Sequence, residues 1–181
     1  MKQEPPFPSS NAASLETKFR KLLQNPNKIL KKYVKKGMSV MDLGCGPGLY
    51  SMELSDLVGT KGEVYAVDIQ QEMLDLLKNK IKLEGIKNIK VHRNTKTKIG
   101  VTSNLDFVLV LYALHEIAYP DKYLTEVYSL LKKGGKLLFV EPKFHVSRKN
   151  FNKNVRFAEE LGFKKVSKPH IFLSRSVLLE K

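Results

Sequence analysis

The most informative segment of this chain is Val40-Met41-Asp42-Leu43-Gly44-Cys45-Gly46-Pro47-Gly48. A short apolar run that passes into a glycine-rich loop is typical of a strand that turns into a helix, because glycine permits a sharp turn and a close approach to a ligand. Twenty residues beyond Gly48, the next apolar run ends at Asp68, whose carboxylate can accept hydrogen bonds from both hydroxyls of a ribose. Together these features predict a nucleoside at the carboxyl ends of the strands.

The surrounding sequence alternates between strand and helix patterns. Amphipathic helical periods lie between the apolar runs, and we expect two of these helices to stop at Gly85 and Gly134. Strands that are apolar on both faces and alternate with helices indicate a parallel sheet covered on both sides. Five runs rich in Val, Ile and Leu are the strand candidates: Ser39–Leu43, Glu63–Val67, Ile89–His92, Asp106–Leu111 and Lys136–Val140.

The C-terminal part predicts two further strands. A helix over Phe151–Leu161 is followed by the runs Phe163–Val166 and Ile171–Glu180, which no helix-length segment separates, so they must pair as an antiparallel hairpin. The expected fold is α/β, a doubly wound seven-stranded sheet that is mostly parallel with an antiparallel C-terminal strand. Upstream, we expect a flexible lead over 1–13, helices over Leu15–Leu23 and Pro26–Tyr33, and a single domain over 14–181.

These motifs resemble the Rossmann-like class I S-adenosylmethionine-dependent methyltransferases, in particular the quinone-biosynthesis and arsenite methyltransferase group. The resemblance runs from about Asn25 to Lys181 and rests on four segments. The four segments are VMDLGCGPG at the first strand, AVDIQ at the second, LDFVLVLYALHEI at the fourth and LLKKGGKLLFVEP around the fifth.

A nicotinamide dinucleotide is a poorer fit as the cofactor, because the dinucleotide-binding fingerprint needs a glycine where this chain has Leu49.

The resemblance implies S-adenosylmethionine as the cofactor and assigns residues to it. Asp42 belongs to the same loop motif, and Leu111 would lie near the methyl group that is transferred. Asn94 stands where the family usually has an acidic residue for the adenine amino group, and its carbonyl oxygen still offers an acceptor. The three loop glycines would face the methionine part of the cofactor, Asp68 the ribose and Ile69 the adenine; the glycines are Gly44, Gly46 and Gly48.

Three residues beyond the strand ends are the catalytic candidates. Methyl transfer from a sulfonium depends mostly on alignment and desolvation, so a general base helps only where the acceptor must lose a proton. His115 is the first choice for that base, with Glu141 and Tyr112 beside it. The alternative is that His115 only holds the loop or the amino-acid end of the cofactor. The four histidines lack metal-ligand spacing, so we expect catalysis without a metal.

Composition narrows the choice of partners. The 181 residues carry 32 Lys plus Arg against 18 Asp plus Glu, a net charge of +14, but only five of these are Arg and the lysines are scattered. Cys45 is the sole cysteine, and with no export signal or membrane span we expect a cytoplasmic chain with a small-molecule substrate and no specific nucleic acid. The alternative is a basic RNA- or ribosome-associated protein with the same fold. No large insert covers the pocket, which leaves the N-terminal helices, a second copy in a homo-oligomer or the substrate itself as the cover.

Overall fold

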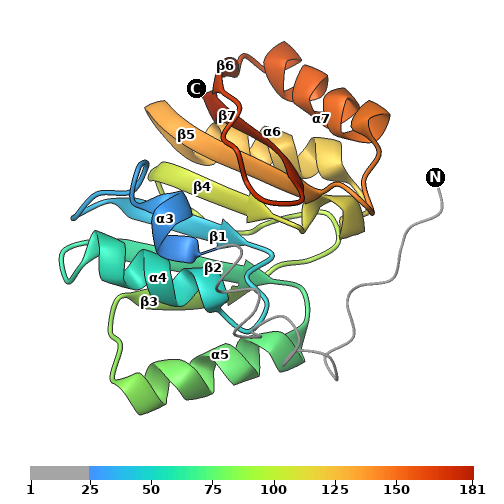
Figure 1. Cartoon of the computed structure of the whole chain (residues 1–181). Coiled ribbons are helices and arrows are strands. Elements are labelled where there is room, and N and C mark those ends of the chain that lie inside the picture. The colour runs from blue at the N-terminus through green and yellow to red at the C-terminus, as the bar shows by residue number, and fades with distance from the viewer. Residues whose placement is uncertain (1–24) are drawn as a thin grey trace.

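Within residues 25–181, seven strands form one sheet in the order β3-β2-β1-β4-β5-β7-β6 (Figure 1). Strands β1 to β5 run parallel to one another, whereas β7 runs antiparallel to both β5 and β6. This arrangement confirms the predicted α/β fold with its antiparallel C-terminal strand. The strands span Ser39–Leu43 (β1), Glu63–Asp68 (β2), Ile89–Arg93 (β3), Leu105–Leu111 (β4), Leu131–Pro142 (β5), Lys164–Ser167 (β6) and Ser174–Glu180 (β7).

The computed structural model describes residues 25–181, so the predicted lead over 1–13 and the helix over Leu15–Leu23 lie outside the described residues. Among residues 25–181 no helix is long and apolar enough to cross a membrane. The helices span Pro26–Leu30 (α3), Leu49–Val58 (α4), Gln71–Glu84 (α5), Pro120–Leu130 (α6) and Arg148–Glu160 (α7), with a short 3₁₀ helix at Leu114–Glu116.

Helices cover both faces of the sheet. Side chains alternate along each strand, so on β1 Val40 packs with α3, α4 and α5, while Met41 and Leu43 pack with α6 and α7 on the other face. Figure 1 shows these two groups of helices on opposite sides of the sheet. The near-continuous apolar strands predicted by the sequence are therefore buried on both sides.

Two helix ends differ from the prediction. Helix α3 stops at Leu30 instead of Tyr33, because the N–H of Tyr33 bonds the carbonyl of Leu30 and tightens the last turn. The predicted stop at Gly134 is wrong: α6 ends at Leu130, and Gly134 lies inside β5 with a φ of 77°. By contrast, α5 does end at Gly85 in the left-handed conformation.

The end of α6 is closed by a lysine instead of a glycine. The Nζ of Lys181 donates to the carbonyls of Tyr128 at 2.6 Å and Leu131 at 2.7 Å, with a longer contact of 3.4 Å to Ser129. These carbonyls have no partner within the helix, so the ammonium group of Lys181 caps the C-terminus of α6. The chain can then enter β5 directly, and Leu131 pairs with Leu105.

The topology brings the predicted site residues to one edge of the sheet. Strand order reverses between β1 and β4, which is where doubly wound sheets bind ligands, outside the carboxyl ends of the strands. Leu43 at the end of β1 pairs with Val67 on β2 and Val110 on β4. The segments that follow these strands therefore lie next to one another.

Candidate functional site

The loop between β1 and α4 needs its glycines for two reasons, the conformation of its turn and the close packing around it. Gly44, Gly46 and Gly48 have φ angles of 77°, 52° and 92°, a region that other residues rarely adopt. A Cβ on Gly44 would lie 2.2 Å from the Cβ of Ala113, and one on Gly48 would lie 2.3 Å from a methyl group of Leu77. The loop is thus wedged between the segment after β4 and helix α5.

Asp42 is buried just before this loop. Its carboxylate accepts a hydrogen bond of 2.6 Å from the hydroxyl of Ser51 on α4. Burial raises the pKa of Asp42 to about 7, while the bond from Ser51 acts in the opposite direction. Asp42 therefore ties β1 to the first turns of the helix that the glycine loop opens, a role visible without any ligand.

Backbone hydrogen bonds hold Asp68 in place at the carboxyl end of β2. It is 8% exposed at the end of β2, where one oxygen accepts the N–H of Gly46 at 2.8 Å and the other accepts the N–H of Gln70 at 2.9 Å. Burial raises the pKa of Asp68, and these backbone bonds oppose the shift. The backbone N–H of Ile69 also bonds this carboxylate, and the acceptor capacity that remains suffices for a ligand hydroxyl. Beside it, Arg93 holds the carbonyl of Ile69 at 3.1 Å.

Asn94 follows β3 and carries an unsatisfied acceptor. Its backbone N–H bonds the carbonyl of Asp68 at 3.2 Å, so it stands directly beside the β2 end. Its side chain donates from Nδ2 to the hydroxyl of Tyr123, whereas Oδ1 is buried and has no partner among the described residues. Buried acceptors are nearly always paired, so a ligand donor at this position is expected. Asp68 and Asn94 therefore fit a nucleoside with an amino group on its base.

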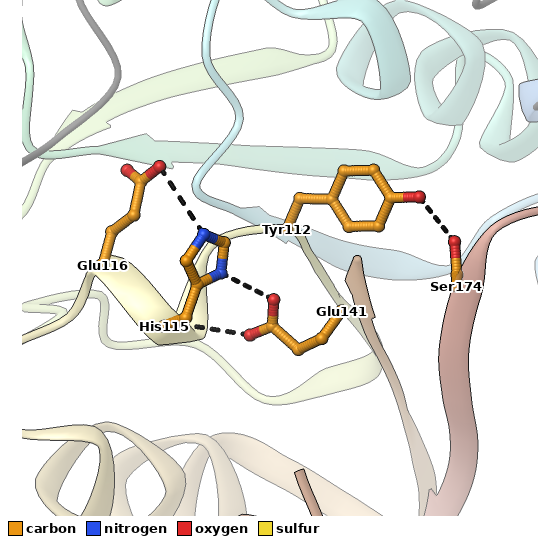
Figure 2. Close-up of polar contacts among 5 residues, drawn as sticks. All are labelled: Tyr112, His115, Glu116, Glu141 and Ser174. Atoms are coloured by element: carbon orange, nitrogen blue, oxygen red, sulfur yellow. Dashed lines mark hydrogen bonds and ion pairs between the residues drawn. The ribbon is translucent and has the colours of Figure 1, made fainter. Parts of the chain in front are cut away.

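The structure brings His115 and Glu141 into contact, as Figure 2 shows. The Nδ1 of His115 lies 2.7 Å from Oε2 of Glu141, and the backbone N–H of His115 donates to Oε1 at 3.1 Å. Burial raises the pKa of Glu141, which is fully buried, and the bonds from His115 oppose that shift. On the other side of the ring, Nε2 lies 3.9 Å from a carboxylate oxygen of Glu116.

Tyr112 lies in the same region but points elsewhere. Its backbone has a φ of 60°, which is strained for a residue other than glycine, and its N–H bonds the carbonyl of Val140 at 2.9 Å. The phenolic oxygen lies 2.5 Å from the hydroxyl of Ser174, whose proton goes to the carbonyl of Phe172. Figure 2 shows the ring directed towards Ser174 and away from the His115 and Glu141 pair.

Leu111 ends β4 directly before Tyr112 and is 7% exposed. Cys45 is a buried thiol whose pKa is raised well above its usual value by burial. Its Sγ contacts the carbonyl of Gly46 at 3.5 Å, which matches a packing role in the loop. Within residues 25–181 no group of three or more His, Cys, Asp or Glu side chains is placed to hold a metal ion.

Several partners of these residues carry no sequence signal. Ser51 sits in an amphipathic helix like any other polar residue, and Ser174 is separated from its partner by 62 residues. Lys80 donates from α5 to the carbonyl of Pro47 in the glycine loop at 2.9 Å. Tyr123 occupies a core position of α6, where the apolar periodicity marks it only as a buried aromatic.

Comparisons with known proteins agree with this geometry. The model of the methyltransferase domain family matches residues 34–171. The chain is 36% identical over 109 residues to the demethylmenaquinone methyltransferase of Lactococcus lactis, covering 58% of this chain and 42% of that enzyme. It is 34% identical over 110 residues to the ubiquinone/menaquinone biosynthesis C-methyltransferase UbiE of Haemophilus ducreyi, covering 60% of this chain and again 42% of the relative. The chain thus spans less than half the length of these curated relatives.

A solved structure resembles the chain over nearly its whole length. It is an S-adenosylmethionine-dependent methyltransferase from Aquifex aeolicus, 29% identical, with a TM-score of 0.86 over 96% of this chain and 98% of that one. The family match, the glycine loop and the strand-end carboxylate agree with one another. The chain belongs to the methyltransferase domain family, in the class that uses S-adenosylmethionine.

Proposed function

We propose that this chain transfers a methyl group from S-adenosylmethionine to a small hydroxyaromatic acceptor that loses a proton in the reaction. The observation that carries the proposal is the contact between His115 and the buried carboxylate of Glu141. S-adenosylmethionine supplies an activated methyl group on a sulfonium. The residues then need to align the acceptor, exclude water and remove its proton.

Glu141 supports His115 in the role of base. Its carboxylate receives both the backbone N–H and the Nδ1 proton of His115, which leaves the lone pair of the imidazole at Nε2. The same carboxylate stabilises the imidazolium once Nε2 has taken the hydroxyl proton of the acceptor. Glu116, 3.9 Å from Nε2, adds a second negative charge on that side. A neutral amine acceptor would need no such arrangement.

The surface beside this pair supports an aromatic acceptor. The ring of His145 stacks on that of His115 with centroids 6.4 Å apart. Two apolar residues close to Glu141 are exposed: Phe144, three residues after it, by 81%, and Leu173, whose carbonyl accepts the N–H of Lys143, by 44%. The names of the two curated relatives also refer to quinone-type acceptors. Deprotonation of a hydroquinone or phenol makes the oxygen and the adjacent ring carbon nucleophilic, so either atom could receive the methyl group.

Cofactor binding is proposed to depend on Asp68, Asn94 and the glycine loop, within one domain over 14–181. Asp68→Ala should weaken binding of S-adenosylhomocysteine by roughly 1.5 to 3 kcal/mol, the scale of hydrogen bonds to a charged group. Calorimetry can measure this, with the exposed Asp75→Ala on α5 as the matched control. Equal affinity in the wild type and Asp68→Ala would remove Asp68 from the cofactor site.

The acceptor assignment is tested with labelled S-adenosylmethionine against hydroquinones, phenols, amines and RNA, each at low and moderate salt. We expect label in the hydroxyaromatic acceptors, unchanged by salt and by chelator. His115→Gln and Glu141→Gln should lower turnover by about 10² or more with cofactor affinity retained, while Glu160→Gln, an exposed carboxyl on α7, should not. Incorporation at one defined RNA position that survives moderate salt would favour the RNA-associated alternative, because binding through phosphates alone is lost as salt rises.

A further inference from the structure

We propose that Tyr123 selects the nucleobase of the cofactor by fixing the orientation of the Asn94 side chain. In that orientation a carbonyl oxygen, and not an amide N–H, faces the base, so the site accepts a 6-amino purine and rejects a 6-oxo purine. This inference rests on the proposed cofactor site but is independent of the acceptor.

The orientation follows from counting protons around the Tyr123 hydroxyl. The hydroxyl has a single proton, and it donates that proton to the backbone carbonyl of Thr95, which can only accept. The oxygen of Tyr123 can therefore only accept from Asn94, and Nδ2 is the one side-chain atom of Asn94 able to donate. Nδ2 also lies 3.4 Å from the same Thr95 carbonyl. A flipped amide would instead aim Oδ1 at a carbonyl and at a hydroxyl whose proton is already used.

The consequence is the buried Oδ1 of Asn94, which has no partner among the described residues. Asn94 stands next to Asp68, the proposed ribose ligand, since its N–H bonds the carbonyl of Asp68 at 3.2 Å. A base attached to that ribose reaches the neighbouring strand end, where Oδ1 can accept from an exocyclic amino group. A 6-oxo group offers only another acceptor and would face Oδ1 without a proton between them.

Helix α6 holds the same loop at a second point. Glu126 lies one turn beyond Tyr123, and its carboxylate accepts the N–H groups of Ile99 and Gly100, each at 2.8 Å. The loop is therefore anchored without the tyrosine hydroxyl. Tyr123→Phe keeps the buried ring and the Glu126 anchor and removes only the group that orients the amide.

The test compares binding of S-adenosylhomocysteine and S-inosylhomocysteine by calorimetry in four proteins: wild type, Tyr123→Phe, Asn94→Asp and the double variant. The wild type should prefer the adenine compound. In Tyr123→Phe the amide can rotate and donate to the 6-oxo group, so the preference should fall roughly tenfold, the effect of one hydrogen bond. A carboxylate has no orientation to lose and no proton to donate. Adding Tyr123→Phe to Asn94→Asp should therefore change the preference for the adenine compound by less than about twofold. Loss of a hydrogen bond would change it by more than that.

A measurement on the wild type provides a second test that needs no variant. In NMR spectra the side-chain amide protons of Asn94 should show stronger cross-relaxation with the ring of Tyr123 than with the bound base. Stronger cross-relaxation with the base would mean that Nδ2 faces the ligand, and the inference would be wrong.

The outcomes separate this inference from the proposed function. Tyr123 would have only a structural role if Tyr123→Phe lost affinity equally for both compounds. The same would follow if Tyr123→Phe changed the preference in the Asn94→Asp variant as much as it does in the wild type. Binding and selectivity as expected, with no methyl transfer to hydroxyaromatic compounds, would overturn the acceptor assignment and leave the inference standing. A wild type that binds neither compound would overturn both.

Discussion

Asp42 should make the stability of this protein fall as the pH rises from 3.8 to about 7. Its pKa is raised by burial from 3.8 to about 7 in the folded chain, whereas the unfolded chain titrates near the ordinary value. At pH values between 3.8 and about 7, Asp42 therefore holds a proton in the folded state that it has released in the unfolded state. Stability is therefore greatest at low pH for this group and declines as the pH approaches the folded pKa.

The size of the effect follows from the shift. Each pH unit over which the two states differ by one proton changes the free energy of unfolding by about 1.4 kcal/mol. Between pH 5 and pH 8 the difference extends over about two units, so Asp42 should lower the free energy of unfolding by roughly 3 kcal/mol. Asp42→Asn keeps the shape and the bond from Ser51 but does not titrate, and it should abolish this decline.

Urea denaturation at pH 5 and pH 8 measures the effect in the wild type and Asp42→Asn. Glu141, whose pKa is also raised by burial, is present in both proteins and cancels in the comparison. The charge of Asp68 is one of the causes that raise the pKa of Asp42, so its coupling to Asp42 is part of the measured difference. Asp56→Asn, an exposed carboxyl on α4, is the matched control and should follow the wild type. If the wild type and Asp42→Asn lost the same stability between the two pH values, the buried carboxyl would not hold a proton and the reasoning would fail.

Two further predictions concern stability. Lys181→Met should lower the free energy of unfolding by about 1 to 3 kcal/mol because it removes the cap of α6, whereas the exposed Lys133→Met should change it by less than about 0.5 kcal/mol. Equal midpoints in urea for the two variants would contradict the capping role. Gly44→Ala should cost roughly 2 to 4 kcal/mol, because the new Cβ meets Ala113 at 2.2 Å in addition to the backbone strain. Gly37→Ala, with a φ of 82° and open space around it, isolates the strain alone, and thermal melting of both variants would show whether the contact with Ala113 matters.

Local patterns are enough to predict the sheet and the strand ends at which the candidate site residues lie. The strand ranges agree with the structure to within a residue for β1 to β4, because each strand is a short apolar run bounded by turn residues. The strand-end position of Asp68 follows from the same runs, since parallel strands end at a common edge. The helix stop at Gly134 was wrong because a distant lysine caps α6, and no local pattern encodes that contact.

The residues at the strand ends can be identified from the sequence, because hydrophobic periodicity and glycine spacing act over a few neighbouring residues. The contacts of those residues become visible only in the folded chain. The Nδ1 of His115 meets Glu141 26 residues away, Tyr112 turns to Ser174, and the amide of Asn94 is oriented by Tyr123. The physical reason is that the direction of a hydrogen bond depends on the partners that packing brings within 3 Å, and those partners come from strands and helices far apart in the chain.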